Sequence, residues 1–151
     1  MTDAALIWDD QSFSADLALA AGDLATDTGL HGALLVSLFT DRRARADDVL
    51  PSEDGDRRGW WGDVTAAEAD DLIGSRLWLL SREKLTARVL ARAREYGLEA
   101  VAWLLRDGVA AEIDVTTEIA APGVLAIAVY VTRPGGPARQ RFDFVWRGMA
   151  Q

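Results

Sequence analysis

The chain has 151 residues, half of them hydrophobic, and a formal net charge of −8. This length suits one compact domain spanning residues 1–151. The acidic balance disfavours a protein that coats nucleic acid or anionic lipid, because both require clustered positive charge. The absence of cysteine excludes disulfides and thiolate metal sites, and the single histidine, His31, excludes histidine-rich metal ligation. Without a secretory signal or an apolar stretch of ~20 residues, the chain is expected to fold in a cytoplasm.

The N-terminal third predicts a hairpin followed by a helix. Two short apolar segments, Leu6–Trp8 and Phe13–Leu19, are separated by polar residues and are typical of paired strands. Apolar side chains then recur at three- and four-residue spacing across residues 30–39, which predicts a first helix with one buried side. Asp27 or Thr28 is the expected N-cap, because a short polar side chain can accept a hydrogen bond from a free backbone amide there.

A long loop is predicted after this helix. Residues 41–63 carry many charges, Pro51 and three glycines without a sustained period. They indicate a loop that is ordered by itself or by a partner. Thr65–Glu68 matches a capping box, which predicts a short helix beginning at Thr65. Ser75 is a candidate cap for a further turn that ends at Leu80.

Residues 85–104 predict the long helix of the fold, because apolar side chains recur along one stripe. The stripe comprises Leu85, Val89, Ala93, Tyr96, Ala100, Trp103 and Leu104. Asp107-Gly108 is expected to end the helix, since glycine accepts a left-handed backbone without a Cβ clash. Gly97 lies inside the helix, where glycine costs up to ~1 kcal/mol relative to alanine, so a bend is expected near Gly97.

The C-terminal third predicts an antiparallel β-meander. Residues 112–119 alternate between apolar and polar, the period-two pattern of a strand with one wet face. Leu125–Val131 and the alternating segment around Phe142–Trp146 predict two further strands, with a turn at Pro134–Pro137. Short N-terminal strands, central helices and a final antiparallel meander indicate an α+β fold, with the long helix laid across the sheet.

Candidate chemistry is sparse, and no catalytic, cofactor-binding or metal-binding residue is assigned. His31 sits in an apolar helix pattern without a nucleophile elbow, so a structural role is expected. The loop glycines are not followed by the lysine and hydroxyl of a phosphate-binding loop. Acidic residues could collect a hard cation, but their spacing is not that of a calcium loop. These acids are Asp47, Asp48, Glu53, Asp54 and Asp56.

Arg57–Asp63, with the sequence RRGWWGD, is the most informative segment. Two indoles beside paired arginines are unusual in a solvated loop, so either the domain's own core or a partner chain must cover Trp60 and Trp61. Nucleic acid could be gripped by arginine charge and indole stacking, but interleaved aspartates cancel much of that field. A protein interface suits these residues better, since tryptophan and arginine are enriched in interface hot spots.

Six segments carry a resemblance to a known family: Leu38–Ala44, Asp47-Asp48, Arg57–Asp63, Gly74–Leu80, Glu99–Leu104 and Asp107–Ala110. In this order they strongly resemble the baseplate wedge protein family of Mu-like contractile-tailed phages. The resemblance covers nearly the whole chain, and Arg57–Asp63 and Gly74–Leu80 are its specific segments. That family is similar, more distantly, to the small wedge protein of T-even phages, which is sometimes labelled an acidic lysozyme.

The resemblance implies a structural subunit of a contractile tail baseplate or tail-like particle, assembled in the host bacterial cytoplasm. Its expected partners are other wedge, hub or sheath-proximal tail proteins, with no nucleic acid, membrane or small-molecule substrate. The expected partner contacts are Arg57, Arg58, Trp60, Trp61, Asp63 and Arg76.

The chain departs from one motif of the wider group. A glutamate–proline–arginine motif near the end of the main helix helps those proteins to dock onto the large wedge proteins. After Trp103 this chain reads Leu104–Gly108 without a proline, so a docking role is not carried over to Arg106. The alternative function is a lysozyme-like tail enzyme that degrades peptidoglycan, but no acid here matches a muralytic pattern, and no enzymatic activity is expected.

Overall fold

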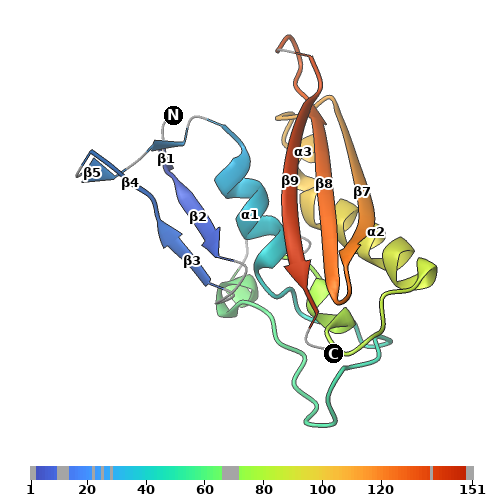
Figure 1. The fold of residues 1–151 in the computed structure, drawn as a ribbon. Helices are drawn as coiled ribbons and strands as arrows, with labels where there is room; N and C mark the ends of the chain where they lie inside the picture. Colours follow the sequence, from blue (N-terminus) through green and yellow to red (C-terminus); the bar gives the residue numbers. More distant parts are fainter. Residues whose placement is uncertain are drawn as a thin grey trace.

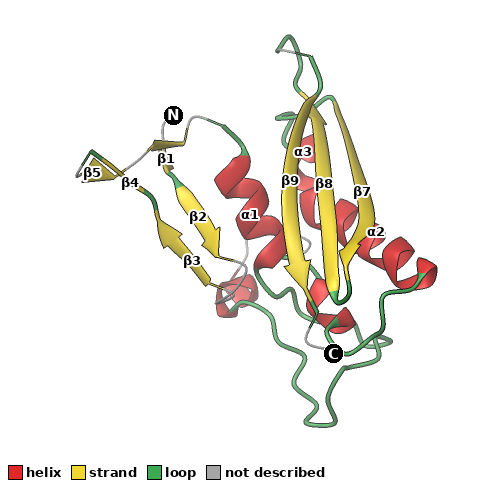
Figure 2. Ribbon diagram, in the orientation of Figure 1, coloured by secondary structure: helices red, strands yellow, loops and turns green. Residues whose placement is uncertain are grey.

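A computed structural model gives the structure of the chain and describes residues 3–9, 14–21, 23–24, 26–27, 29–65, 72–136 and 138–148. The order of elements confirms an α+β fold (Figure 1). Short strands come first, helices and a long loop follow, and a three-stranded antiparallel sheet ends the chain (Figure 2). Nowhere in the described ranges is a helix long and apolar enough to span a membrane.

The N-terminal strands pair locally, apart from the main sheet. Among the described residues of this region there are six short strands: β1 (Asp3–Ala4), β2 (Leu6–Asp9), β3 (Ser14–Leu17), β4 (Leu19–Ala20), β5 (Asp23–Leu24) and β6 (Thr26–Asp27). β2 and β3 form an antiparallel pair with Leu6 opposite Leu17, which confirms the predicted hairpin. Its turn, residues 10–13, lies outside the described residues. β1 pairs with β6 and β4 pairs with β5, both antiparallel.

The first helix, α1 (His31–Phe39), confirms the predicted buried face, which includes Leu34 and Leu38. The N-cap of α1 differs from the prediction. Leu30 holds the N-cap position without a side-chain cap bond, and Asp27 belongs to β6, where its backbone pairs with Asp3. Asp27 was therefore the wrong choice of cap, because strand pairing holds it in an extended conformation before the helix begins. The alternative cap, residue 28, falls outside the described residues.

The described part of the next segment contains two short 3₁₀ helices, η1 (Trp61–Thr65) and η2 (Leu77–Leu80). The helix predicted from the capping box runs into residues 66–71, which lie outside the described part of the chain; Thr65 itself ends η1 and its hydroxyl donates to the Gly62 carbonyl at 2.9 Å. The predicted turn before Leu80 is η2. Arg76, rather than the predicted Ser75, holds its N-cap position without a side-chain cap bond, although Ser75 Oγ accepts from the Leu77 amide at 3.3 Å.

The long helix is α2 (Ala87–Val101), continued by α3 (Trp103–Arg106). It ends at Asp107-Gly108 as predicted, with Gly108 in the left-handed region at φ +70°. The interruption between α2 and α3 falls at Ala102, five residues beyond Gly97, and a bend at Gly97 itself stays a prediction.

Gly97 serves close packing. A Cβ built there would lie 3.1 Å from Val115 Cγ1, so glycine lets α2 approach the first strand of the sheet. This contact explains why α2 tolerates a residue that is otherwise unfavourable inside a helix.

The predicted meander is confirmed as β7 (Glu112–Ala121), β8 (Val124–Thr132) and β9 (Gln140–Arg147), with β8 in the centre. Val115 faces Val129 across β7 and β8, and Ile127 faces Phe144 across β8 and β9. α2 crosses one face of this sheet (Figure 1). The core lies between them and α1, and His31 contributes a ring stacked 5.3 Å from Phe144, consistent with the structural role expected for it.

Candidate functional site

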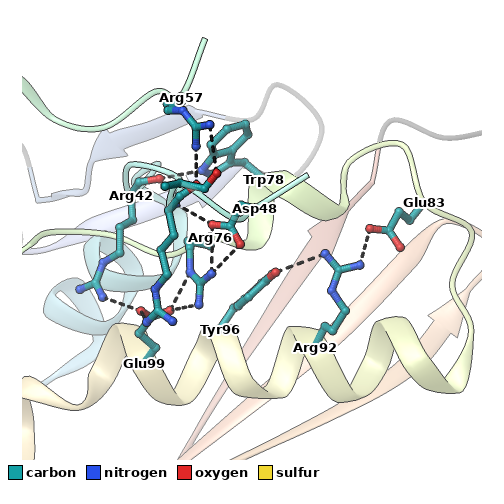
Figure 3. A network of polar contacts seen from close by, with 11 residues as sticks. Arg42, Asp48, Arg57, Arg76, Trp78, Glu83, Arg92, Tyr96 and Glu99 are labelled. Carbon is teal, nitrogen blue, oxygen red and sulfur yellow. Dashed lines mark hydrogen bonds and ion pairs between the residues drawn. The ribbon is translucent and has the colours of Figure 1, made fainter. Parts of the chain in front are cut away.

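The long loop between α1 and η1 is fastened to itself by Arg57. The Ala44 amide donates to the Arg57 carbonyl at 2.9 Å, so the two arms of the loop pair through their backbones. The Arg57 guanidinium donates in turn to the carbonyls of Arg45 and Ala46 on the opposite arm. Figure 3 shows Arg57 directed at this arm. These bonds give the loop a defined shape without regular secondary structure.

The next two residues turn the chain sharply. Arg58 has a positive φ of +50°, and Gly59 follows at φ +102°. A Cβ on Gly59 would lie 2.7 Å from the Cβ of Arg43, so only glycine fits there. The Arg58 guanidinium binds Asp41 Oδ2 at 2.7 Å and lies 4.5 Å from the centre of the Trp78 ring. Arg58 is therefore held against the body of the domain by an ion pair and a cation–π contact.

The turn presents two tryptophans at the surface. Trp61 is 78% exposed and Trp60 is 46% exposed, and their ring centroids lie 5.4 Å apart. A Cβ on Gly62 would meet the Trp60 ring at 2.2 Å, so this glycine leaves room for the indole to fold over the backbone. Val64, which lies on η1 together with Trp61, is 88% exposed. We call Trp60, Trp61 and Val64 the tryptophan face.

Asp63 connects the tryptophan face to the chain that precedes η2. Its Oδ1 accepts from the Ile73 amide at 3.2 Å. Gly74 follows at φ +91°, where a Cβ would lie 2.3 Å from the Thr40 carbonyl oxygen. The Ser75 amide donates to that same carbonyl at 2.9 Å. The segment before η2 is thus packed directly against the end of α1, and Asp63 anchors η1 to it.

Arg76 lies beneath the loop and is buried, with 8% of its surface exposed. Its Nη1 donates to both carboxylate oxygens of Asp48 at 2.8 and 3.0 Å, and its Nε donates to Glu99 Oε2 at 2.9 Å. The guanidinium also lies 4.5 Å from the centre of the Tyr96 ring. Figure 3 shows Arg76 between the loop and α2, so it ties the two together.

The surroundings of Arg76 decide its protonation. Burial alone would lower the pKa of the guanidinium, because desolvation penalises the charged form. The hydrogen bonds to Asp48 and Glu99 outweigh this penalty and raise the pKa of Arg76 above its ordinary value. The cation is therefore permanent and stabilises the contact between loop and helix.

Glu99 on α2 also forms ion pairs with two further arginines. Its Oε1 lies 2.6 Å from Arg45 Nη2 and 3.4 Å from Arg42 Nη1. One carboxylate thus serves three guanidinium groups, with Arg76 as the third (Figure 3). Such sharing leaves an excess of positive charge beside α2 in an otherwise acidic chain.

The structure divides the six predicted interface residues into three groups. Trp60 and Trp61 are at the surface, whereas Arg57, Arg58 and Asp63 are engaged in holding the loop. Arg76 is buried in the ion-pair network.

No pattern in the sequence identified Asp48 and Glu99 as the partners of Arg76, because they lie 28 and 23 residues away from it in the chain. The one available signal was the placement of Glu99 three residues after Tyr96, on the apolar side of a predicted helix.

The loop acids do not form a recognisable cation site. Asp48 binds Arg76, and Asp54 accepts from the Ser52 hydroxyl at 2.7 Å. That hydrogen bond lowers the pKa of Asp54. Within the described ranges, no three acidic or histidine side chains come together in a way that could hold a metal ion.

Comparison with known proteins places the chain in a family. The model of the family described as phage protein GP46 matches residues 30–138. Over 136 residues the chain is 46% identical to the baseplate protein gp46 of Escherichia phage Mu, covering 90% of each protein. It is 36% identical over 141 residues to the Mu-like prophage FluMu protein gp46 of Haemophilus influenzae, covering 93% of this chain and 94% of that protein. The chain belongs to the phage protein GP46 family, as the sequence resemblance indicated; the more distant similarity to the T-even wedge protein stays a prediction.

Proposed function

We propose that this member of the GP46 family is a structural subunit of a phage tail baseplate, which docks onto a larger baseplate subunit through the tryptophan face. The name of the phage Mu relative supports the baseplate role. One observation carries the docking role: Trp61 and Val64 are 78% and 88% exposed on η1, and contacts within the chain hold both η1 and the loop before it in place. Large exposed apolar groups on an ordered scaffold are typical of protein interaction sites.

The six interface residues have different parts in this proposal. Trp60 and Trp61 contact the partner directly. Arg57, Arg58 and Asp63 hold the turn that presents them and line the rim of the interface. Arg76 is a positioning residue beneath the loop, because its guanidinium is already bound by acids of this chain.

Trp61 alone offers a large apolar contribution to a complex. A tryptophan side chain buries roughly 150–250 Å² when it is covered. At ~25 cal/mol per Å², covering the exposed 78% of Trp61 contributes about 3–5 kcal/mol to a complex. This magnitude is that of an interface hot spot.

We further propose that the subunit works without enzymatic activity and joins wedge, hub or sheath-proximal proteins in the host bacterial cytoplasm. The support is the absence of a candidate acid pair in the sequence and the involvement of Asp48, Glu99 and Asp63 in structural bonds.

The test measures the affinity of the chain for the large baseplate proteins encoded beside it. Trp61→Ala should weaken the complex by at least tenfold, while the circular dichroism spectrum and the unfolding midpoint remain those of the wild type. Val49→Ala is the matched control, because Val49 is 83% exposed in the same loop but outside the tryptophan face. Equal affinities for wild type and Trp61→Ala would refute the docking role. Unfolding of Trp61→Ala would instead assign the ring to the core.

A further inference from the structure

A cavity of about 850 Å³ lies next to the tryptophan face. It is bounded by α1, the Leu72–Gly74 segment, the junction of α2 and α3, and the start of β2. Its apolar wall includes Ala33, Val36 and Trp103. This volume is within the range of pockets that enclose a ligand, roughly 300–1,000 Å³. The cavity can therefore receive a group that projects from a partner.

The cavity carries positive charge. Its described lining contains five arginines, Arg42, Arg43, Arg45, Arg76 and Arg106, against two acids, Asp63 and Glu99. The whole chain has a formal net charge of −8, so this wall is a local reversal of sign. Clefts lined by one sign of charge concentrate ligands of the opposite sign.

Arg42 has a buried hydrogen-bond donor that lacks an acceptor within the described structure. Its side chain is 12% exposed, one amino group donates to the Leu72 carbonyl, and the other lies 3.4 Å from Glu99 Oε1. Its Nε is buried and has no hydrogen-bond partner within the described structure. A buried charged donor without an acceptor costs ~1–3 kcal/mol or more, so an acceptor that enters the cavity is favoured there.

We propose that this cavity, which we call the arginine cavity, receives an acidic segment of the larger baseplate subunit. A carboxylate of that segment lies among the arginines, and its apolar residues pack against Ala33 and Trp103. This inference rests on the proposed docking function. Trp60 belongs to both the tryptophan face and the cavity lining, so one partner can cover the face and extend a segment inward. Charge complementarity selects an acidic segment over a neutral or basic one.

Charge reversal tests the proposal in the complex with the co-purified baseplate partner. Arg43→Glu and Arg106→Glu change exposed residues of the lining and should each weaken affinity at least tenfold. Arg88→Glu is the matched control, because it makes the same change of charge at an exposed position outside the lining and should alter affinity less than twofold. The affinity of the wild type should also fall with added salt.

A variant that blocks the cavity without changing its charge controls for the possibility that charge reversal disturbs folding. Ala33 is exposed in α1 and lines the cavity, so Ala33→Trp fills the space without changing charge. It should weaken the complex at least tenfold while the unfolding midpoint stays within a few degrees of the wild type.

Peptides tiled across the partner identify the occupant. Binding to the wild type should be confined to peptides that contain Asp or Glu, and Arg43→Glu should abolish it. Inorganic phosphate that raises the melting temperature, with no peptide bound, would identify a small-anion site and overturn the proposal. A dimer of this chain that Arg43→Glu dissociates would also overturn it.

The results separate the two proposals. If the wild type forms no complex with any baseplate protein, the docking function fails. If the complex forms and depends on Trp61, but the lining variants bind like the wild type, the docking function stands and the cavity proposal fails.

Discussion

Replacement of Arg76 by methionine should destabilise the fold strongly. The change keeps most of the aliphatic volume and removes the guanidinium that binds Asp48 and Glu99. The Arg76 and Asp48 side chains are only 10% and 12% exposed, so the carboxylate left behind is poorly solvated. Breaking a buried ion pair by removing one partner typically costs ~3–5 kcal/mol.

The partial exposure of the network sets the expected size of this effect. Because the Glu99 side chain is 22% exposed and keeps Arg42 and Arg45 as neighbours, we expect the lower end of that range, about 3 kcal/mol. For a chain of this size, such a loss lowers the melting temperature by roughly 6–12 °C. Urea unfolding followed by circular dichroism measures the free energy of unfolding directly.

Two further variants sharpen the measurement. Arg76→Lys keeps the charge but loses the planar fork, so it should be destabilised by less than Arg76→Met. Arg141→Met removes a solvent-exposed ion pair with Asp143 and should unfold like the wild type. If Arg76→Met unfolds within ~0.5 kcal/mol of the wild type, the network does not hold the loop on α2, and the reasoning is refuted.

The remaining predictions concern the backbone and the pH dependence. Gly74→Ala should cost at least ~3 kcal/mol, because its Cβ would lie 2.3 Å from the Thr40 carbonyl oxygen; Gly55→Ala, with the same sign of φ and no atom within 4 Å, should cost only ~1 kcal/mol in urea unfolding. Equal losses would contradict the steric argument. The hydrogen bond from Arg94 lowers the pKa of Asp114 below 3.8, so the stability that this carboxylate contributes is present above that pH and is lost as pH falls through the lowered pKa. Melting temperatures of Asp114→Asn and the wild type should differ at pH 6 and converge as the pH falls through the lowered pKa of Asp114; a constant difference would exclude this contribution.

Local periodicity predicted those helices and strands in which the apolar pattern itself shows which side faces the core. The stripe from Leu85 to Leu104 and the alternation from Glu112 to Ile119 both correspond to observed elements, because each pattern alone selects one face for burial. The N-cap at Asp27 failed because strand pairing, a contact outside the local window, places that residue in β6. The glycine at position 97 likewise depends on a contact outside the local window, since the approach of Val115 explains it.

The candidate site was only partly accessible from the sequence. The composition of Arg57–Asp63 singled out Trp60 and Trp61, because indoles flanked by glycines and arginines are unusual in a loop, but it left open whether the core or a partner covers them. The same composition could not show that Arg57 and Arg58 are occupied within the chain, or that Arg76 is buried. Those facts depend on Asp41, Asp48 and Glu99, which meet the arginines only after folding.

The most direct test of the docking role is to co-express the wild-type chain with the large baseplate proteins encoded beside it and to measure the mass of the species in which it elutes. Size-exclusion chromatography with light scattering gives this mass without labels. A stoichiometric complex that contains a larger baseplate protein is the result that the tryptophan face predicts. A chain that elutes as a free monomer in the presence of every such protein would contradict the docking role.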